Sequence, residues 1–139
     1  MRLVVDASVV AKWFNTEELS NKAVEVKDAF VRGALKLVAP IHIIYEVGNS
    51  VWMNAQLTDE DASDAIASLM RIDLNLLTPD IERARRAMEI ARLKKTTFYD
   101  ATYLQAAEEL KTALLTADES QMAAGKGIAK TIHLREARV

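Results

Sequence analysis

The chain has 139 residues, a formal net charge of −2 and no cysteine. This length suits one domain, so we expect a single domain over residues 1–139. The absence of cysteine excludes disulfides, zinc–thiolate sites and cysteine nucleophiles. No apolar run is long enough to span a membrane, and the N-terminus reaches Asp6 too early for a signal peptide. These features predict a cytoplasmic protein without a membrane association.

Strand-like and helix-like segments alternate along the chain. A buried strand at the N-terminus, centred on residues 3–5, ends at Asp6, and apolar periodicity and capping residues define the segments that follow. The predicted helices cover residues 7–14, 17–32, 41–56, 58–71, 79–94, 97–111 and 118–124, and the other predicted strands cover 36–39, 73–77, 113–116 and 129–133. This alternation predicts an α/β fold, a three-layer α/β/α sandwich around a mostly parallel central sheet.

Four acidic residues stand where such a fold gathers functional side chains. Asp6 and Asp118 follow apolar strands, while Asp100 and Glu46 lie near helix starts. Each has an ordinary structural explanation: Asp6 and Asp118 suit helix capping or a first helical turn, Asp100 suits a capping box with Thr97, and Glu46 suits a solvated helix face.

Taken together, the four acids favour a metal site. The carboxyl edge of an open parallel sheet is where ligands bind. Crowded carboxylates repel one another, and a hard cation removes that repulsion. Because no histidine belongs to the set, Mg²⁺ or Mn²⁺ is expected rather than zinc.

At these positions the chain resembles the PIN domain family, in particular the VapC-type toxin ribonucleases. The resemblance covers nearly the whole length and rests on an ordered set of short motifs. They are Val4-Val5-Asp6-Ala7-Ser8, Lys12-Trp13-Phe14, Tyr45-Glu46-Val47-x-Asn49, Tyr99-Asp100-Ala101-x-Tyr103 and Leu115-Thr116-Ala117-Asp118.

The resemblance implies a Mg²⁺- or Mn²⁺-dependent endoribonuclease whose catalytic and metal-binding acids are Asp6, Glu46, Asp100 and Asp118. Thr116 occupies the supporting hydroxyl position two residues before the fourth acid. The resemblance also implies an RNA substrate, a homodimer, and a small antitoxin protein as partner. In the mechanism we expect, a divalent ion held mainly by the three aspartates activates water against the scissile phosphate.

The main basic concentration, residues 83–95, has two interpretations. Arg92, Lys94 and Lys95 are candidate RNA-phosphate contacts because they lie closest in sequence to Asp100. For the segment as a whole we favour a solvated helix face, partly paired with Glu82 and Glu89.

The remaining conspicuous side chains receive structural roles. We assign no catalytic role to His42 or His133. Trp13 and Trp52 are expected in the core or at a dimer interface. Met53, Met70, Met88 and Met122 are expected to fill gaps in the core.

Two other functional classes remain as alternatives. The first is a catalytically inactive PIN-like module that binds RNA or protein. The second is a receiver or phosphotransfer domain, which also places acids at strand ends. Receivers use a pair of adjacent acids after the first strand, and dehalogenase-type phosphatases use Asp-x-Asp there. The segment Asp6-Ala7-Ser8 fits neither arrangement.

Overall fold

A five-stranded, fully parallel sheet forms the centre of the computed structural model, which describes all residues 1–139. The strand order is β3-β2-β1-β4-β5, so the first strand lies in the middle. The strands are β1 (Arg2–Val5), β2 (Lys36–Pro40), β3 (Asn75–Leu77), β4 (Ala113–Thr116) and β5 (Thr131–His133). Buried apolar strands of this kind need helices on both faces of the sheet.

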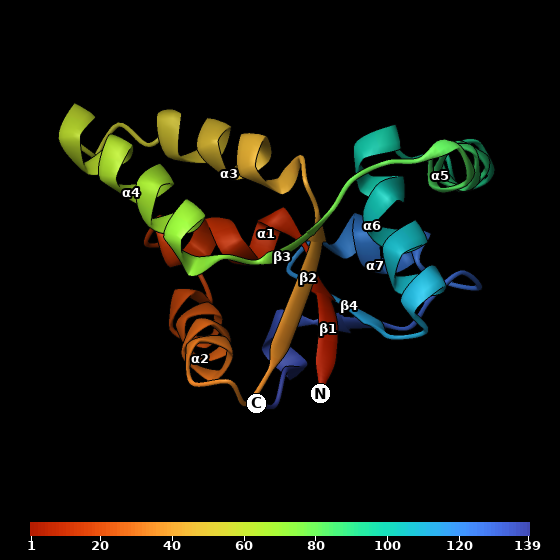
Figure 1. The fold of residues 1–139 in the computed structure, drawn as a ribbon. Helices are drawn as coiled ribbons and strands as arrows, with labels where there is room; N and C mark the ends of the chain where they lie inside the picture. Colours follow the sequence, from red (N-terminus) through yellow and green to blue (C-terminus); the bar gives the residue numbers. More distant parts are fainter.

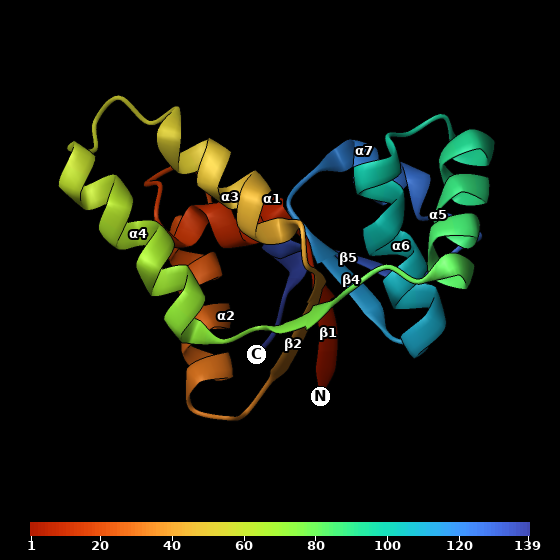
Figure 2. The ribbon, with the colours of Figure 1, turned by 45° about the horizontal axis from the view of Figure 1, so that its top comes forward.

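Helices cover the sheet on both sides, as Figures 1 and 2 show. On one side lie α1 (Ala7–Val10), a 3₁₀ turn η1 (Ala11–Trp13), α2 (Ser20–Val31), α3 (Ile43–Trp52) and α4 (Asp59–Ile72). On the other side lie α5 (Ile81–Lys94), α6 (Phe98–Leu110) and α7 (Glu119–Ala124). The chain closes with a second 3₁₀ turn, η2 (Leu134–Glu136). The predicted three-layer α/β/α architecture is therefore confirmed.

Local capping fixes where three of the longer helices begin. Thr58, Asp80 and Thr97 each accept a hydrogen bond from the backbone N–H three residues later, at the starts of α4, α5 and α6. Such a cap satisfies one of the orphan donors of a helix and contributes roughly 1 kcal/mol. The Thr97 cap matters for the site described below because its partner is the N–H of Asp100.

A single hydrophobic core of 31 buried residues joins the sheet to the helices. Trp13 belongs to it, and its indole N–H donates to the carbonyl of Ala23 at 2.8 Å. Trp52 is 78 % exposed on α3, so it is not a core residue. The prediction of core methionines is wrong for Met53, Met70 and Met88, which are all at least half exposed. Helical spacing alone does not show which face of a helix is covered.

Several predicted boundaries differ from the structure. The predicted helix 41–56 ends at Trp52, and the predicted strands 73–77 and 129–133 contain only three paired residues each. Pro40, which lies between the predicted strand 36–39 and the predicted helix 41–56, is the last residue of β2 and lies opposite Leu77 of β3. A proline is tolerated at this end of β2 because no hydrogen bond of the sheet requires an N–H at residue 40. None of the helices has the length and apolar composition needed to cross a membrane.

Candidate active site

Asp6 and Thr116 meet at the carboxyl edge of the sheet because β1 and β4 are paired in register. Val5 lies opposite Leu115, and the N–H of Asp6 extends the pairing by donating to the carbonyl of Leu115 at 2.9 Å. The next residues along each strand are therefore neighbours. The Thr116 hydroxyl donates to Oδ2 of Asp6 at 2.6 Å.

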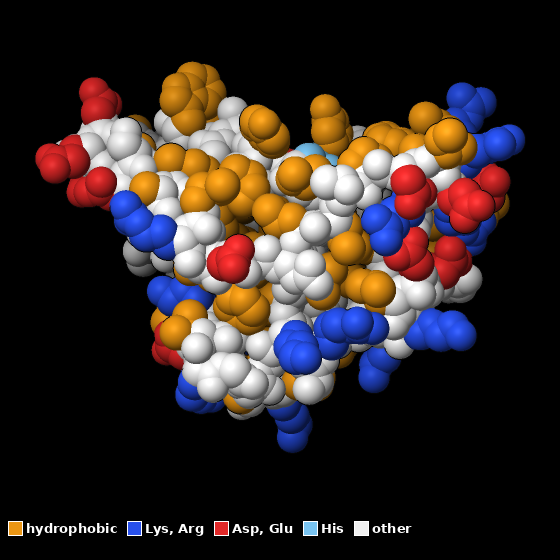
Figure 3. Space-filling view, viewed as in Figure 1, with side chains coloured by type: hydrophobic (Ala, Val, Ile, Leu, Met, Phe, Trp, Pro, Cys, Tyr) orange, Lys and Arg blue, Asp and Glu red, His pale blue; other side chains and the backbone are white.

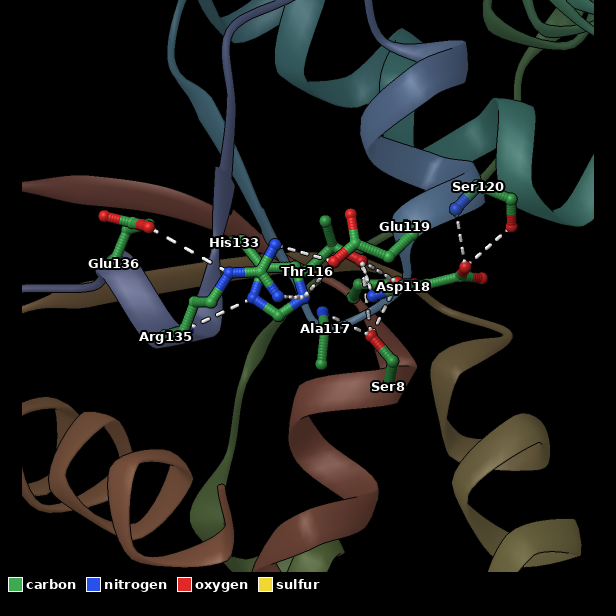
Figure 4. A network of polar contacts seen from close by, with 10 residues as sticks. Ser8, Thr116, Ala117, Asp118, Glu119, Ser120, His133, Arg135 and Glu136 are labelled. Carbon is green, nitrogen blue, oxygen red and sulfur yellow. Dashed lines mark hydrogen bonds and ion pairs between the residues drawn. The ribbon is translucent and has the colours of Figure 1, made fainter. Parts of the chain in front are cut away.

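A second hydroxyl, that of Ser8, holds the same carboxylate oxygen. Ser8 Oγ donates to Oδ2 of Asp6 at 2.8 Å and accepts from the backbone N–H of Ala117 at 2.9 Å. Thr116 Oγ1 in turn accepts from the N–H of Asp118 at 3.0 Å. Figure 4 shows Ser8 and Thr116 within this network of contacts around the end of β4. Ser8 is a site residue that the sequence did not single out, because it stood only as a member of the motif around Asp6.

Asp6 is a buried acid with an unusual affinity for protons. Only 5 % of the residue is exposed, and this burial raises the pKa of Asp6 to about 6, with the negative charges of Asp100 and Glu46 adding to the effect. The two hydroxyl donors act in the opposite direction because they stabilise the charged form. Asp6 precedes α1, but its side chain makes no capping hydrogen bond. The capping explanation for Asp6 is therefore wrong.

Asp100 and Asp118 approach from two helix starts on the opposite side of the sheet from α3. Asp100 lies in the first turn of α6, and partial burial together with the charges of Glu46 and Asp118 raises its pKa. Asp118 precedes α7, and its Oδ1 accepts from the N–H and the hydroxyl of Ser120 at 2.9 and 2.6 Å. Asp118 therefore caps α7, one residue before the first-turn position that the sequence suggested, and its charge helps to raise the pKa of Asp100.

Glu46 reaches the site from α3 and has two polar neighbours. The buried hydroxyl of Tyr103 donates to Oε1 of Glu46 at 2.8 Å, and Nδ1 of His42 lies 2.7 Å from the same oxygen. Burial, followed by the charges of Glu46 and Asp6, raises the pKa of Tyr103, so its proton stays on the phenol at all ordinary pH values. His42 was expected to have a structural and not a catalytic role, yet the fold places it against a site acid. The i, i+4 spacing of His42 and Glu46 was the available signal.

The four predicted acids thus come together at one edge of the sheet, where the charges of Asp100 and Glu46 help to raise the pKa of Asp6, and those of Glu46 and Asp118 help to raise the pKa of Asp100. Their oxygen donors and mutual repulsion fit a hard divalent cation. No three acidic or histidine side chains are already arranged to hold an ion by themselves. An ion of the Mg²⁺ type fits this arrangement because it retains several water ligands.

One hollow includes Glu46, and a second is lined by its neighbour His42. A polar groove of about 640 Å³ includes Glu46 and the side chains of Asn15, Asn49, Ser50 and Asn54. A smaller hollow of about 160 Å³, beyond His42, has apolar walls that include Ile41, Leu77 and Phe98. The polar groove offers amide and hydroxyl groups beside Glu46.

Two of the six basic residues between positions 83 and 95 are held in ion pairs. Arg83 makes a two-bond contact with Glu109, and Arg86 makes one with Glu108, both glutamates lying on α6. Figure 3 shows acidic and basic side chains intermingled over this pair of helices. The expected partial pairing is confirmed for Glu89, beside Arg86, but Glu82 forms no ion pair, and the main partners lie on α6.

The three candidate RNA contacts differ in their surroundings. Lys94 donates to the backbone carbonyl of Lys126 and ties the end of α5 to the loop before β5. Arg92 and Lys95 are exposed. A free cation for a phosphate is therefore offered by Arg92 and Lys95 rather than by Lys94.

A second polar network continues from the site to the end of the chain. Arg135 donates to Glu119 at 2.6 Å, and its backbone N–H donates to Nδ1 of the buried His133 at 3.2 Å (Figure 4). His133 lies opposite Thr116 in the sheet. Its contacts join β5 to η2 and α7, in agreement with the structural role expected for this histidine.

Residues 3–126 match the family model of the PIN domain. The chain therefore belongs to the PIN domain family, and its relatives place it with the VapC proteins. It is 34 % identical over 123 residues to the ribonuclease VapC3 of Pyrobaculum aerophilum, covering 85 % of this chain and 90 % of that protein. It is 31 % identical over 101 residues to the exonuclease VapC9 of the same organism, covering 72 % of this chain and 75 % of that protein.

The fold comparison agrees with the sequence comparison. The crystal structure of PAE2754 from Pyrobaculum aerophilum superimposes with a TM-score of 0.69 at 26 % identity, covering 97 % of this chain and 90 % of that one. The alternative of a receiver or phosphotransfer domain is thereby excluded, while an inactive PIN-like module is not distinguished from an active one.

Proposed function

We propose that this protein is a Mg²⁺- or Mn²⁺-dependent endoribonuclease and the toxin of a toxin–antitoxin pair. The observation that carries the proposal is the gathering of Asp6, Glu46, Asp100 and Asp118 at one sheet edge, with Asp6 buried among like charges. Membership of the PIN domain family and the ribonuclease relative support the same reaction class.

The four acids would hold the ion, with Asp6, Asp100 and Asp118 as the main ligands. When bound, a divalent ion stabilises negative charge on the scissile phosphate and lowers the pKa of water. The hydroxyls of Ser8 and Thr116 orient the carboxylate of Asp6. Glu46, facing the polar groove, either completes the ligand set or positions the attacking water. Arg92 and Lys95 would contribute sequence-independent phosphate contacts.

The buried position of Asp6 favours this proposal over an inactive module. A carboxylate whose pKa is raised to about 6 by burial costs folding free energy at neutral pH. A domain without a metal would be more stable with a neutral side chain there. Retention of a costly buried acid beside three others is a physical sign of function.

The experiment that tests the proposal is cleavage of a mixed-sequence single-stranded RNA with and without Mn²⁺ or Mg²⁺. Wild type is compared with Asp100→Asn, and with Asp59→Asn, which removes an exposed acid in the first turn of α4. We expect metal-dependent cleavage by wild type and Asp59→Asn, and none by Asp100→Asn. Equal activity in the Asp100→Asn protein would refute the site assignment.

A circular single-stranded RNA separates endonucleolytic from exonucleolytic cleavage, a distinction that matters because the relative VapC3 is a ribonuclease and the relative VapC9 an exonuclease. An endoribonuclease linearises the circle, whereas an exonuclease leaves it intact. We expect linearisation. Purification with the product of any adjacent small open reading frame, followed by measurement of the mass of the complex, tests for the antitoxin and for the homodimer.

A further inference from the structure

His42 makes a set of contacts that a merely space-filling side chain does not need. Its ring meets Tyr99 and Tyr103 edge-on, with centroid distances of 5.2 and 5.3 Å. Its Nε2 lies 2.6 Å from the hydroxyl oxygen of Thr102. Its Nδ1 lies 2.7 Å from Oε1 of Glu46. Neighbouring groups therefore contact both nitrogens of the His42 ring and restrict its orientation.

The hydrogen bonds of the Thr102 hydroxyl define the role of one nitrogen of the His42 ring. The Thr102 hydroxyl donates its one hydrogen to the carbonyl of Tyr99 at 2.6 Å, so the same oxygen accepts from Nε2–H of His42. The opposite nitrogen, Nδ1, then points at Glu46. The angles between Nδ1 and the Glu46 carboxylate lie outside those of an ordinary hydrogen bond, and Nδ1 has no other hydrogen-bond partner. Nδ1 and Oε1 of Glu46 are only 2.7 Å apart, so the two side chains are in direct contact.

Glu46 is thereby held from two sides. Tyr103 donates to Oε1 from the core, and His42 meets the same oxygen from the start of α3. Both of these contacts are made to Oε1. A glutamate has three rotatable bonds and reaches a fixed position only if neighbours restrict them. In metal sites, such outer contacts orient the ligands and strengthen binding.

We propose that His42 is a positioning residue that, together with Tyr103, orients Glu46 for metal binding and phosphodiester cleavage. The inference rests on the proposed metal-dependent nuclease. The chain Tyr99–Thr102–His42–Glu46 links the first turn of α6, which carries Asp100, to α3 on the opposite side of the sheet. His42 therefore sets the distance between acids supplied by two layers of the fold.

Three substitutions of His42 separate positioning from packing. His42→Phe keeps the ring between the two tyrosines and removes both nitrogens. His42→Asn places an amide near the position of Nδ1, and His42→Gln places one near Nε2. Each protein is measured for Mn²⁺ affinity by titration calorimetry and for kcat and KM with the cleaved RNA, after thermal unfolding has shown that it is folded.

We expect His42→Phe to weaken Mn²⁺ binding and lower kcat by roughly 10- to 100-fold, with KM little changed, as for other outer-shell partners. His42→Asn should restore much of the loss and His42→Gln should not. In a Glu46→Gln background, His42→Phe should add no further loss, because coupled residues are not additive. Tyr103→Phe should shift Mn²⁺ affinity in the same direction as His42→Phe.

Failure of the inference is distinguishable from failure of the proposed function. If wild type binds Mn²⁺ and cleaves RNA, but His42→Phe matches it, the role of His42 is refuted and the nuclease stands. Recovery by His42→Gln rather than His42→Asn would also refute it, since Nδ1 would then be dispensable. If wild type neither binds Mn²⁺ more tightly than Asp100→Asn nor cleaves RNA, the proposed function fails and the inference fails with it.

Discussion

At the scale of single residues, Asp6 has the environment that departs furthest from that of an ordinary carboxylate. It is buried, it faces two other acids, and two hydroxyls donate to one of its oxygens. Burial dominates and raises its pKa from 3.8 to about 6. The folded protein therefore holds a proton on Asp6 more tightly than the unfolded chain does.

This difference makes stability depend on pH in a defined direction. The proton on Asp6 stabilises the folded state fully below about pH 4, and this stabilisation is lost as the pH rises through about 6. Without added metal, Asp6→Asn should therefore be more stable than wild type at pH 7.5, by up to about 3 kcal/mol. The gain should vanish below about pH 4. Urea unfolding at pH 4, 5.5 and 7.5 measures it, and a constant difference across this range would contradict the expectation.

Substitutions of Thr116 and Ser8 test how much their hydrogen bonds to Oδ2 of Asp6 contribute to stability. Thr116→Val keeps the shape of a fully buried side chain but leaves Oδ2 of Asp6 and the N–H of Asp118 each without the hydroxyl contact. An unsatisfied buried group costs roughly 1–3 kcal/mol, so Thr116→Val should lower the free energy of unfolding by about that amount. Ser8→Ala should cost less because Ser8 is only partly buried. Urea titration of both variants checks this order, and the reverse order would contradict it.

At the scale of secondary-structure elements, α5 and α6 form a pair held by charge as well as by apolar packing. Arg83 and Arg86 of α5 face Glu109 and Glu108 of α6. Hydrogen bonds from the arginines lower the pKa of both glutamates. Their contribution to stability is present above the ordinary glutamate pKa near 4.5 and is lost as the pH falls below it.

A double-mutant cycle on Arg86 and Glu108 measures this contribution. Because both side chains are about one third exposed, solvent screens the pair, and we expect a coupling of about 0.5–1 kcal/mol. The coupling should shrink in 1 M salt, where the Debye length is about 3 Å. Thermal unfolding of Arg86→Ala, Glu108→Ala and the double variant, at two salt concentrations, provides the test. A salt-independent coupling would show that packing, rather than charge, joins the helices.

At the scale of the whole molecule, the parallel sheet and its two helical layers deliver four acids from four separate segments to one edge. No pair of these acids is closer than 18 residues in sequence, as Asp100 and Asp118 show. The mutual repulsion of the four carboxylates destabilises the folded state, and a bound cation would remove this repulsion. The thermal stability of the protein should therefore report on the ion directly.

Mg²⁺ or Mn²⁺ at millimolar concentration should raise the unfolding temperature, and the rise should be larger at pH 7.5 than at pH 5. At pH 5, Asp6 with its pKa of about 6 is mostly protonated, and binding must release that proton. Differential scanning calorimetry with each ion and with chelator measures the effect. Asp100→Asn should respond less than wild type, whereas Asp59→Asn should respond equally. Equal shifts in all three proteins would indicate non-specific ion binding.

The sequence by itself determined the alternation of strands and helices, the parallel sheet and the four acids, because each depends on local signals. Apolar runs, capping residues such as Thr58 and Thr97, and acids at strand ends are readable within short windows. The family motifs around Asp6 and Asp100 are local as well. Exact boundaries, such as the end of α3 at Trp52, depended on packing and were less well predicted.

Only the tertiary structure decided which partners surround each acid. Ser8 and Thr116 share one oxygen of Asp6 because β1 and β4 are paired in a particular register. Arg83 and Arg86 find their partners on α6 rather than along their own helix alone. His42 reaches Thr102 across 60 residues of chain. Such contacts join residues far apart in sequence, and the three-dimensional packing of the layers, not any local preference, brings them together.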